Sequence, residues 1–441
     1  MPVALRRLCC LIFGLVPVLF VTAPTLVCGQ TDKPTATGQD NDSQLQAEIL
    51  KLNQATTEEL QKAKLRQLRK DKEKAKALVA AAVKMLGSDS GSKLNYNAIT
   101  ILGRTAQFVK NYDAAERFYE RQIELAQKVR KSADSIIDAY ENLILLYFEM
   151  KRYDQVIGTC ERFLDLKGPE ELERVKPFVI EQLVQAKAKK GDFQEAMRIT
   201  QGLLQLSENS WYFLRLKGYV EREAEKYKDA IKTFQEVLEK LEEDENLKPE
   251  IREREIDRTR YILSALYIDI NDIDQAAKQL EILVKKNPTN ATYKNDLGYI
   301  WADNDRNLDE AEKLIREALE LDRKEKEKLK EKGEIDEVRE NAAYLDSMGW
   351  VLFKKKRYKE ALEYLKKAAM DEEEGQHLEI WDHLADCYMA LGMVKEAVQT
   401  WEKGLKLEDL SKRDSERRRK ISEKLKKARQ ALGEPVKKKI D

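Results

Sequence analysis

The chain has 441 residues, which is too long for one ordinary compact core, so several domains or an elongated repeat array are expected. Charged residues make up 36% of the chain, but 80 basic and 80 acidic side chains cancel and are interspersed, which argues against a nucleic-acid-binding protein. Gly (18) and Pro (9) are scarce and the charges mix with Leu and Ala, a composition typical of long amphipathic helices.

Residues 1–29 form the first predicted element, an export signal. Arg6 and Arg7 give a basic start, and no charged residue follows them as far as Gly29. We expect cleavage before Gln30, which makes the protein exported, either periplasmic or secreted. The uncharged run is long enough to span a bilayer, so a retained membrane anchor is the alternative, although its prolines disfavour a continuous helix.

Cys28 raises the alternative of a lipid anchor at the end of the signal. Val27 before it is not the Gly, Ala or Ser that such an anchor signal carries, which argues against lipidation. Cleavage would remove three of the five cysteines and leave Cys160 and Cys387, too few and too far apart for a disulfide framework. It would also remove two arginines from a balanced chain, leaving a net charge of −2.

Residues 30–42 are polar without an apolar period and are predicted to be a flexible spacer. Residues 43–92 have helical composition, and their long apolar-patterned stretch is predicted to pack on the array that follows as an amphipathic helix. Heptad-like spacing in the first turns keeps open a short coiled coil, and with it self-assembly through this region. Its apolar positions are Leu45, Ile49, Leu52, Leu60, Leu65 and Leu68.

Residues 93–408 are self-similar. Each unit has a small marker residue in its second half, and the markers are Ala115, Val156, Ala196, Ala230, Ala276, Ala311, Ala361 and Ala397. Twelve residues before the marker most units carry a small packing residue, such as Gly103, Gly218, Ser264, Gly349 or Ala385, where two helices would approach closely. Four residues after the marker comes a bulky side chain, which we expect to fill the groove of the next unit.

The spacing clusters near 34 residues with a helix, a turn and a second helix in each unit, and it resembles the tetratricopeptide repeat, or TPR. The resemblance implies an all-α, right-handed superhelical solenoid of about eight helix-turn-helix repeats. Residues 323–340 are predicted to be a lengthened helical connection within it. Residues 409–441 are predicted to form a C-terminal capping helix, which covers the apolar edge of the last repeat, and a basic tail.

The last three units, with "NDLGYIWAD", "YLDSMGW" and "WDHLADCY", resemble the C-terminal part of exported bacterial TPR proteins, including outer-membrane TPR lipoproteins. That resemblance implies a non-catalytic scaffold or adaptor, such as those that serve envelope proteases and cell-wall enzymes. It implies protein or peptide partners, no nucleic acid, and no contact with a membrane except through a retained signal or a lipid. We expect no cofactor and no metal, and a monomer or homodimer.

The resemblance further implies a concave groove lined by the first helix of each unit. Aromatic anchors beside hydrogen-bonding groups suit an extended peptide or a partner helix. The candidate groove residues are Tyr212, Arg215, Tyr219, Tyr261, Asn295, Tyr299, Asp346, Trp350, Phe353, Asp382 and Asp386.

Three features invite a chemical interpretation. Ser347 beside Asp346 lacks the surroundings of a nucleophile. The run 354–357 is basic but lies where a helix is expected to end, and cations favour that position. His383, Asp386 and Cys387 share one helix, and an envelope enzyme or metal-dependent protein that uses them remains the alternative to a scaffold.

Overall fold

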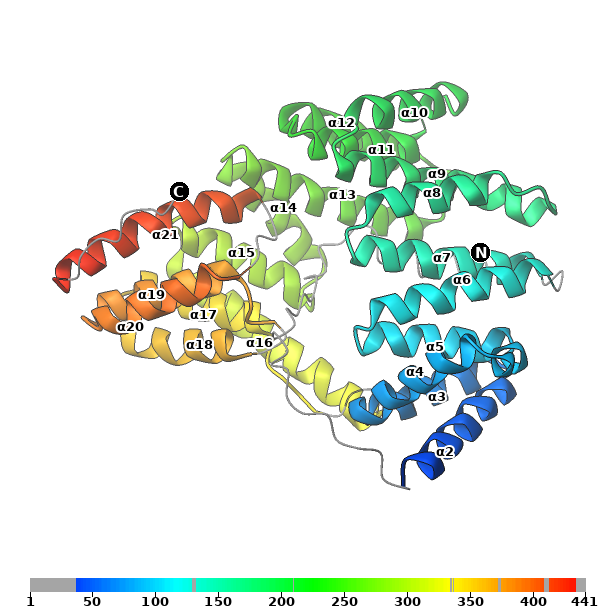
Figure 1. The fold of residues 1–441 in the computed structure, drawn as a ribbon. Coiled ribbons are helices and arrows are strands. Elements are labelled where there is room, and N and C mark those ends of the chain that lie inside the picture. The colour runs from blue at the N-terminus through cyan, green and yellow to red at the C-terminus, as the bar shows by residue number, and fades with distance from the viewer. Residues whose placement is uncertain are drawn as a thin grey trace. The chain divides into compact units, whose positions relative to one another are not determined.

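The computed structural model describes residues 37–128, 132–208, 210–333, 335, 337–371, 374–407 and 412–433. The predicted export signal lies outside the described residues, as does the spacer up to residue 36. Residues 37–42 of the predicted flexible spacer are instead helical and belong to α2 (Thr37–Lys51). The described chain is α-helical apart from two short 3-10 helices and contains no strand, which confirms the all-α class (Figure 1). Within this part, no helix combines the length and the apolar character needed to cross a bilayer.

The chain divides into two compact units, and the boundary falls inside helix α12 (Tyr227–Glu243), between residues 237 and 238. The described residues 37–237 belong to unit 1, and those from 238 onward belong to unit 2. Each unit has apolar clusters of its own.

The N-terminal region of unit 1 is three helices and not one long element. They are α2 (Thr37–Lys51), α3 (Glu58–Arg69) and α4 (Lys72–Leu86), with 3-10 turns at Leu52–Gln54 and Asp89–Lys93. Thr57 and Asp71 break the stretch, because their side chains accept hydrogen bonds from backbone N–H groups of the helices that follow. Ile49 and Leu68 are buried against the rest of unit 1, so these heptad positions are used within the chain.

Eight helix pairs follow, and in each we call the first helix A and the second B. In unit 1 the pairs are α5 (Tyr96–Phe108) with α6 (Tyr112–Lys128), α7 (Ala133–Glu149) with α8 (Tyr153–Leu164), α9 (Glu170–Lys190) with α10 (Phe193–Leu206), and α11 (Trp211–Glu223) with α12. From α13 on, within unit 2, they are α13 (Pro249–Asp269) with α14 (Ile273–Lys286), α15 (Ala291–Asp303) with α16 (Leu308–Glu331), α17 (Ala342–Lys354) with α18 (Tyr358–Met370), and α19 (Leu378–Ala390) with α20 (Val394–Gly404). All eight markers lie on B helices and are completely buried, as the repeat pattern predicts.

Close approach of the two helices explains the glycines of the A helices. A Cβ atom added at Gly103 would lie 2.4 Å from Tyr119 Cε1, and one at Gly349 would lie 2.5 Å from Leu365 Cγ. Tyr119 and Leu365 are the bulky residues four positions after their markers. They therefore fill the space beside the glycine of their own repeat, and the prediction that they fill the groove of the next unit is wrong.

Each turn between A and B helices contains a residue in the left-handed conformation. In seven pairs it lies five residues before the marker, and in the α15–α16 pair six residues before, where the turn has one extra residue. These residues are Lys110, Lys151, Gly191, Glu225, Asn271, Asp305, Lys356 and Gly392. Only two of the eight are glycine, so most turns place a side chain in a conformation that L-residues disfavour.

The predicted helical connection over 323–340 is helical only as far as Glu331, the end of α16. Asn341 then caps α17 by accepting a hydrogen bond from Tyr344 N. The final helix, α21 (Lys412–Ala431), packs on α19 and α20, as expected for a cap. It buries Ile421 and Ala428 in a cluster with Trp401 of α20.

Candidate functional site

The predicted groove residues occupy equivalent places on the A helices. Counted from the packing residue, they lie at offsets −6, −3, +1 and +4, which place them on one helical face. We call the side chains at these offsets the A-helix surface and treat it separately in each unit.

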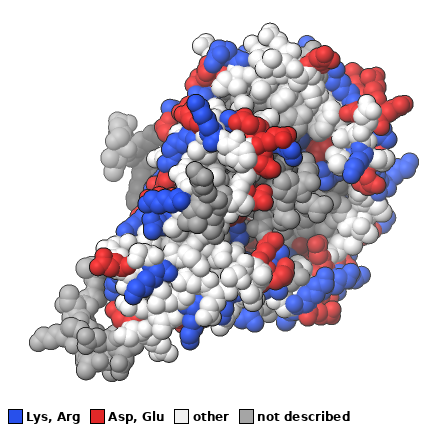
Figure 2. Space-filling model, turned by 90° about the vertical axis from the view of Figure 1, so that its right-hand side faces the viewer, with Lys and Arg blue, Asp and Glu red and all other residues white. Residues whose placement is uncertain are grey.

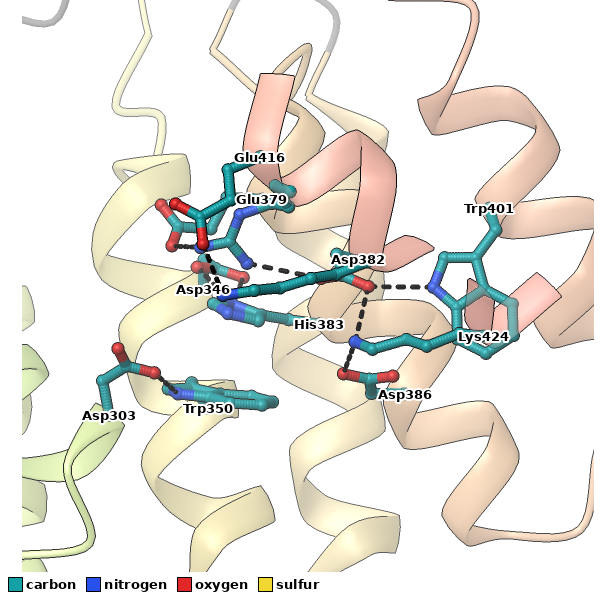
Figure 3. Close-up of polar contacts among 12 residues, drawn as sticks. Asp303, Asp346, Trp350, Glu379, Asp382, His383, Asp386, Trp401, Glu416 and Lys424 are labelled. Carbon is teal, nitrogen blue, oxygen red and sulfur yellow. Dashed lines mark hydrogen bonds and ion pairs between the residues drawn. The ribbon is translucent and has the colours of Figure 1, made fainter. Parts of the chain in front are cut away.

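Trp350 of α17 is enclosed by its neighbours in unit 2. Its indole ring stacks on the ring of His383 with centroids 3.9 Å apart and planes 11° apart, and Phe353 stacks on it with centroids 4.9 Å apart. Its Nε1 donates a hydrogen bond of 3.0 Å to Asp303 Oδ1 on α15 (Figure 3). Only 8% of Trp350 is exposed, so it bridges consecutive A helices and offers a partner little free area.

Asp346 of α17 pairs with His383 of α19. His383 Nδ1 lies 3.0 Å from Asp346 Oδ2 and 3.1 Å from Oδ1, and both residues are buried. Burial alone would lower the pKa of His383, but the Asp346 carboxylate outweighs it and the net shift is upward. The sequence had placed these two residues in separate hypotheses, and the structure joins them in one contact between repeats.

Asp382 and Asp386 of α19 receive cations from α21. Lys424 Nζ lies 2.9 Å from Asp382 Oδ1 and 2.6 Å from Asp386 Oδ2, and Arg417 lies 3.3 Å from Asp382 Oδ2. Trp401 Nε1 donates a further hydrogen bond of 2.9 Å to Asp382 Oδ1 (Figure 3). The chain's own C-terminal helix therefore contacts the A-helix surface at these two candidates.

Glu379 belongs to this surface but was absent from the predicted set. It accepts a hydrogen bond of 2.6 Å from the hydroxyl of Tyr299, a predicted groove residue on α15, and it pairs with Arg417. Burial would raise the pKa of Glu379, but Arg417 reverses this and lowers it. The signal was present in the sequence, because Glu379 lies at offset −6 from Ala385, as Tyr212 does from Gly218.

Tyr261 and Asn295 both donate hydrogen bonds to Asp296 of α15. The Tyr261 hydroxyl donates a hydrogen bond of 2.5 Å to Asp296 Oδ2, and Asn295 Nδ2 donates one of 3.2 Å to Asp296 Oδ1. The Oδ1 atom of Asn295 is buried without a hydrogen-bond partner. Burial raises the pKa of Asp296.

The three candidates of unit 1 lie on α11. Tyr212 donates a hydrogen bond to Glu181 of α9, and Arg215 lies 3.7 Å from the same carboxylate, with its guanidinium 4.9 Å from the Tyr212 ring centroid. Lys189 of α9 lies over the ring of Tyr219 at 5.8 Å. These candidates therefore join neighbouring A helices, and their binding of a partner stays a prediction.

The residues of the chemical alternatives have separate partners. Cys387 Sγ donates to Tyr358 O at 3.3 Å, and burial raises the pKa of its thiol to about 11, which disfavours a thiolate. Ser347 Oγ donates to Ala343 O at 2.9 Å within its own helix. In the described segments, no three His, Cys, Asp or Glu residues are placed to share a metal ion.

The basic run that ends α17 is paired with acids of α16 and of the turn between α15 and α16. Lys354 Nζ lies 3.0 Å from Asp305 Oδ2, and Lys355 and Arg357 both reach Glu312 of α16, at 2.7 Å and 2.9 Å. Charges of both signs also alternate over the face seen in Figure 2, without a large area of one sign. The run is therefore a joint between repeats and does not form an anion-binding surface.

Comparison with known proteins identifies the repeat. Three family models described as tetratricopeptide repeat match residues 98–133, 265–326 and 352–411. The chain is a tetratricopeptide-repeat protein. A TPR repeat-containing protein of Pseudomonas aeruginosa is 31% identical over 121 residues, which cover 27% of this chain and 18% of that protein. This chain thus spans less than a fifth of that relative's length.

Three solved structures have a partial likeness to this chain. MamA from Desulfovibrio magneticus RS-1 has 20% identity and a TM-score of 0.33, covering 43% of this chain and 91% of that chain. A tetratricopeptide repeat protein from Parabacteroides merdae has 13% identity and a TM-score of 0.43, covering 70% and 98%. Yeast Tom70 has 15% identity and a TM-score of 0.40, covering 93% and 68%. The tetratricopeptide repeats support a role as a protein-interaction scaffold.

Proposed function

We propose that the protein is an exported, non-catalytic TPR scaffold that binds protein or peptide partners on its A-helix surface. The observation that carries the proposal is the recurrence of aromatic and charged side chains at the same four offsets on successive A helices. An extended surface of this kind suits a peptide or a helix better than a small molecule. Export rests on the basic start and uncharged run of residues 1–29.

The half-buried aromatic residues are the anchors that we assign to a partner. Tyr219 and Phe353 retain exposed area, whereas Trp350 is nearly closed off by its neighbours. Aromatic side chains of this size dominate binding energy at protein interfaces. The sequence resemblance suggests that the partners are envelope proteases or cell-wall enzymes.

Affinity capture from the envelope fraction of the source cells tests this function. The double variant Tyr219→Ala, Phe353→Ala should lose a partner that the unaltered chain retains, because each change removes an anchor. Tyr364→Ala is the matched control, since it removes a half-buried aromatic ring from the B helix α18. Equal recovery of the same partners by the unaltered chain and the double variant would show that the A-helix surface is not the binding site.

Export has its own test, by intact mass. A chain isolated from the envelope should have lost residues 1–29 and begin at Gln30. A mass that includes residues 1–29 would support the retained anchor, and a mass with a lipid on Cys28 would support the lipoprotein alternative.

A further inference from the structure

One face of α21 is built from two cations and three apolar side chains. Counted from Arg417, these follow at +4 (Ile421), +7 (Lys424), +8 (Leu425) and +11 (Ala428), a spacing that puts all five on one side of a helix. The three apolar residues are buried in the cluster that includes residues of α19 and α20. The cations of this face are those that reach the acids of α19.

The opposing face of α19 carries Glu379, Asp382 and Asp386, at offsets −6, −3 and +1. These are A-helix surface positions, so α21 occupies the part of that surface that the last repeat contributes. The first turn of α21 also extends along unit 2, where Arg413 pairs with Asp269 on the A helix α13. The helix is therefore more than a cover for the apolar edge of the array, because it fills a place where the fold would receive a partner.

The chemistry of this place selects cations. Asp382 is only 4% exposed, and its carboxylate depends on Arg417, Lys424 and the Trp401 indole. Burial raises the pKa of Asp386 and the neighbouring Asp382 raises it further, while Lys424 opposes both effects. Buried carboxylates without cations are costly, so an occupant must bring positive charge to two sites.

Few apolar side chains attach α21 to the last repeat. Its buried apolar side chains are Ile421, Leu425 and Ala428, and the other contacts of its inner face are made by charged groups. Ionic contacts of this type can be replaced by an equivalent set on another helix, because the acids recognise charge and position and not the chain that supplies them.

We propose that this face of α19 and α20 is a docking site for a basic amphipathic helix of a partner protein, and that α21 is its resident occupant. The partner helix would carry Arg or Lys at positions 0 and +7 and apolar residues at +4, +8 and +11. The proposal rests on the proposed function, since it names the kind of partner that the last repeat receives. The partner competes with α21 for the same acids.

A labelled peptide of residues 412–433 serves as the probe, and its binding to the full-length chain is followed by fluorescence anisotropy. In the unaltered chain the internal α21 competes, so the peptide should bind weakly. The double variant Arg417→Ala, Lys424→Ala weakens that competitor and should bind the peptide at least about tenfold more tightly. Lys424→Ala alone, which leaves Arg417 in place, should give an intermediate affinity.

The matched control is Arg419→Ala, Lys426→Ala. It removes the same two charges at the same spacing from the exposed side of α21, so it should bind the peptide as weakly as the unaltered chain. A peptide with Arg417→Glu and Lys424→Glu should not bind any of these chains. An Ala- and Gln-based peptide with only the five residues of the inner face should displace the probe, and its scrambled form should not.

Three results would overturn the proposal. The first is equal peptide affinity for the inner-face variants and the exposed-face control. The second is binding that survives Asp382→Asn combined with Asp386→Asn in the Arg417→Ala, Lys424→Ala background. The third is self-association of the Arg417→Ala, Lys424→Ala variant in light scattering, because the docking site would then be occupied by a second copy of this chain. Capture of partners through Tyr219 and Phe353 would then still support the scaffold, so the two proposals fail separately.

Discussion

The A-helix surfaces of the two units satisfy their polar groups in different ways. In unit 1, Asp138 of α7 accepts hydrogen bonds from Tyr96 of α5 and Gln122 of α6 and pairs with Arg104 of α5, so helices adjacent in the array supply every one of these donors. In unit 2, Asp382 of α19 depends on the C-terminal helix. The repeats therefore complete the surface around Asp138 themselves, whereas the surface of the last repeat, around Asp382, is completed by a helix from outside the repeats.

The largest expected effect is the loss of an acid from the second surface. Asp382→Ala should lower the free energy of unfolding of unit 2 by about 3 kcal/mol, because the buried indole N–H of Trp401 loses its acceptor and Arg417 and Lys424 each lose one of two carboxylates. Asp138→Ala in unit 1 should cost only about 1 kcal/mol, since that carboxylate is one-third exposed. Urea unfolding, followed by tryptophan fluorescence and circular dichroism, measures both. Equal losses would remove the contrast between the surfaces.

Packing, unlike the surfaces, should be the same in both units. Gly103→Ala and Gly349→Ala should each cost about 1–3 kcal/mol, because the new methyl group overlaps Tyr119 or Leu365. Gly158→Ala on α8 is the control, since a methyl group there meets nothing within 4 Å and should be neutral or mildly stabilising. Melting temperatures of the three variants test this, and a large difference between the first two would mean that the units pack differently.

The joints between repeats should differ by the number of cations they contain. Glu312 is paired with Lys355, Arg316 and Arg357; burial would raise its pKa, but these cations lower it to about 2. Glu312→Gln should therefore cost about 2 kcal/mol at neutral pH. Because the folded pKa is below the unfolded one, this contribution is present above about pH 4.5 and is lost as the pH falls towards 2.

Glu116 is the counterpart of Glu312 in unit 1, one residue after its marker. It pairs with Arg152, which lies in a Lys-Arg-Tyr turn (151–153) equivalent to the one that contains Arg357 (356–358). With one arginine and the Tyr147 hydroxyl as its partners, Glu116→Gln should cost only about 1 kcal/mol. Urea unfolding of both variants at pH 7 and pH 3 should show a smaller difference between them at the lower pH, and a constant difference would contradict the assignment.

The smallest effect expected is a pH dependence confined to unit 2, which contains both histidines of the chain, His377 and His383. The groups around His383 are Asp346, Glu379, Arg417 and Tyr299, and the pKa of His383 is raised. Its stabilisation is therefore complete below the unfolded value near 6.5 and is lost as the pH rises through the folded value. We therefore expect unit 2 to lose stability above that range, and His383→Gln should abolish this loss. A pH dependence that remains in this variant would exclude His383 as the cause.

The helix pairs could be predicted because close packing leaves a periodic record in the sequence. Gly103 and Gly349 mark helix contact, and the markers alternate with bulky residues at fixed distances. The breaks in the N-terminal region were also legible, since Thr57 and Asp71 are good capping residues ahead of acidic first turns, and the prediction of one long element overlooked them.

The pairing within the surfaces could not be predicted in the same way. Asp346 meets His383 across 37 residues and Asp382 meets Lys424 across 42, and no local pattern specifies such pairs. The apolar stripe of α21 was visible in the sequence, and it predicts a cap correctly. The sequence does not indicate which acids the cations of α21 pair with, so the ion pair between Lys424 and Asp386 could be identified only in the structure. The same holds for the enclosure of Trp350 by His383 and Phe353.

The left-handed turns are sites where single substitutions could raise the melting temperature of the protein. Lys110, Lys151, Glu225 and Lys356 all adopt a conformation that glycine takes without penalty, and their side chains are not among those of the A-helix surface. Glycine at these four sites would relieve the backbone strain and stabilise the repeats, and it would leave the residues of the A-helix surface unchanged. A lineage that keeps lysine and glutamate there can accept destabilising changes elsewhere and recover from them by single substitutions in a turn.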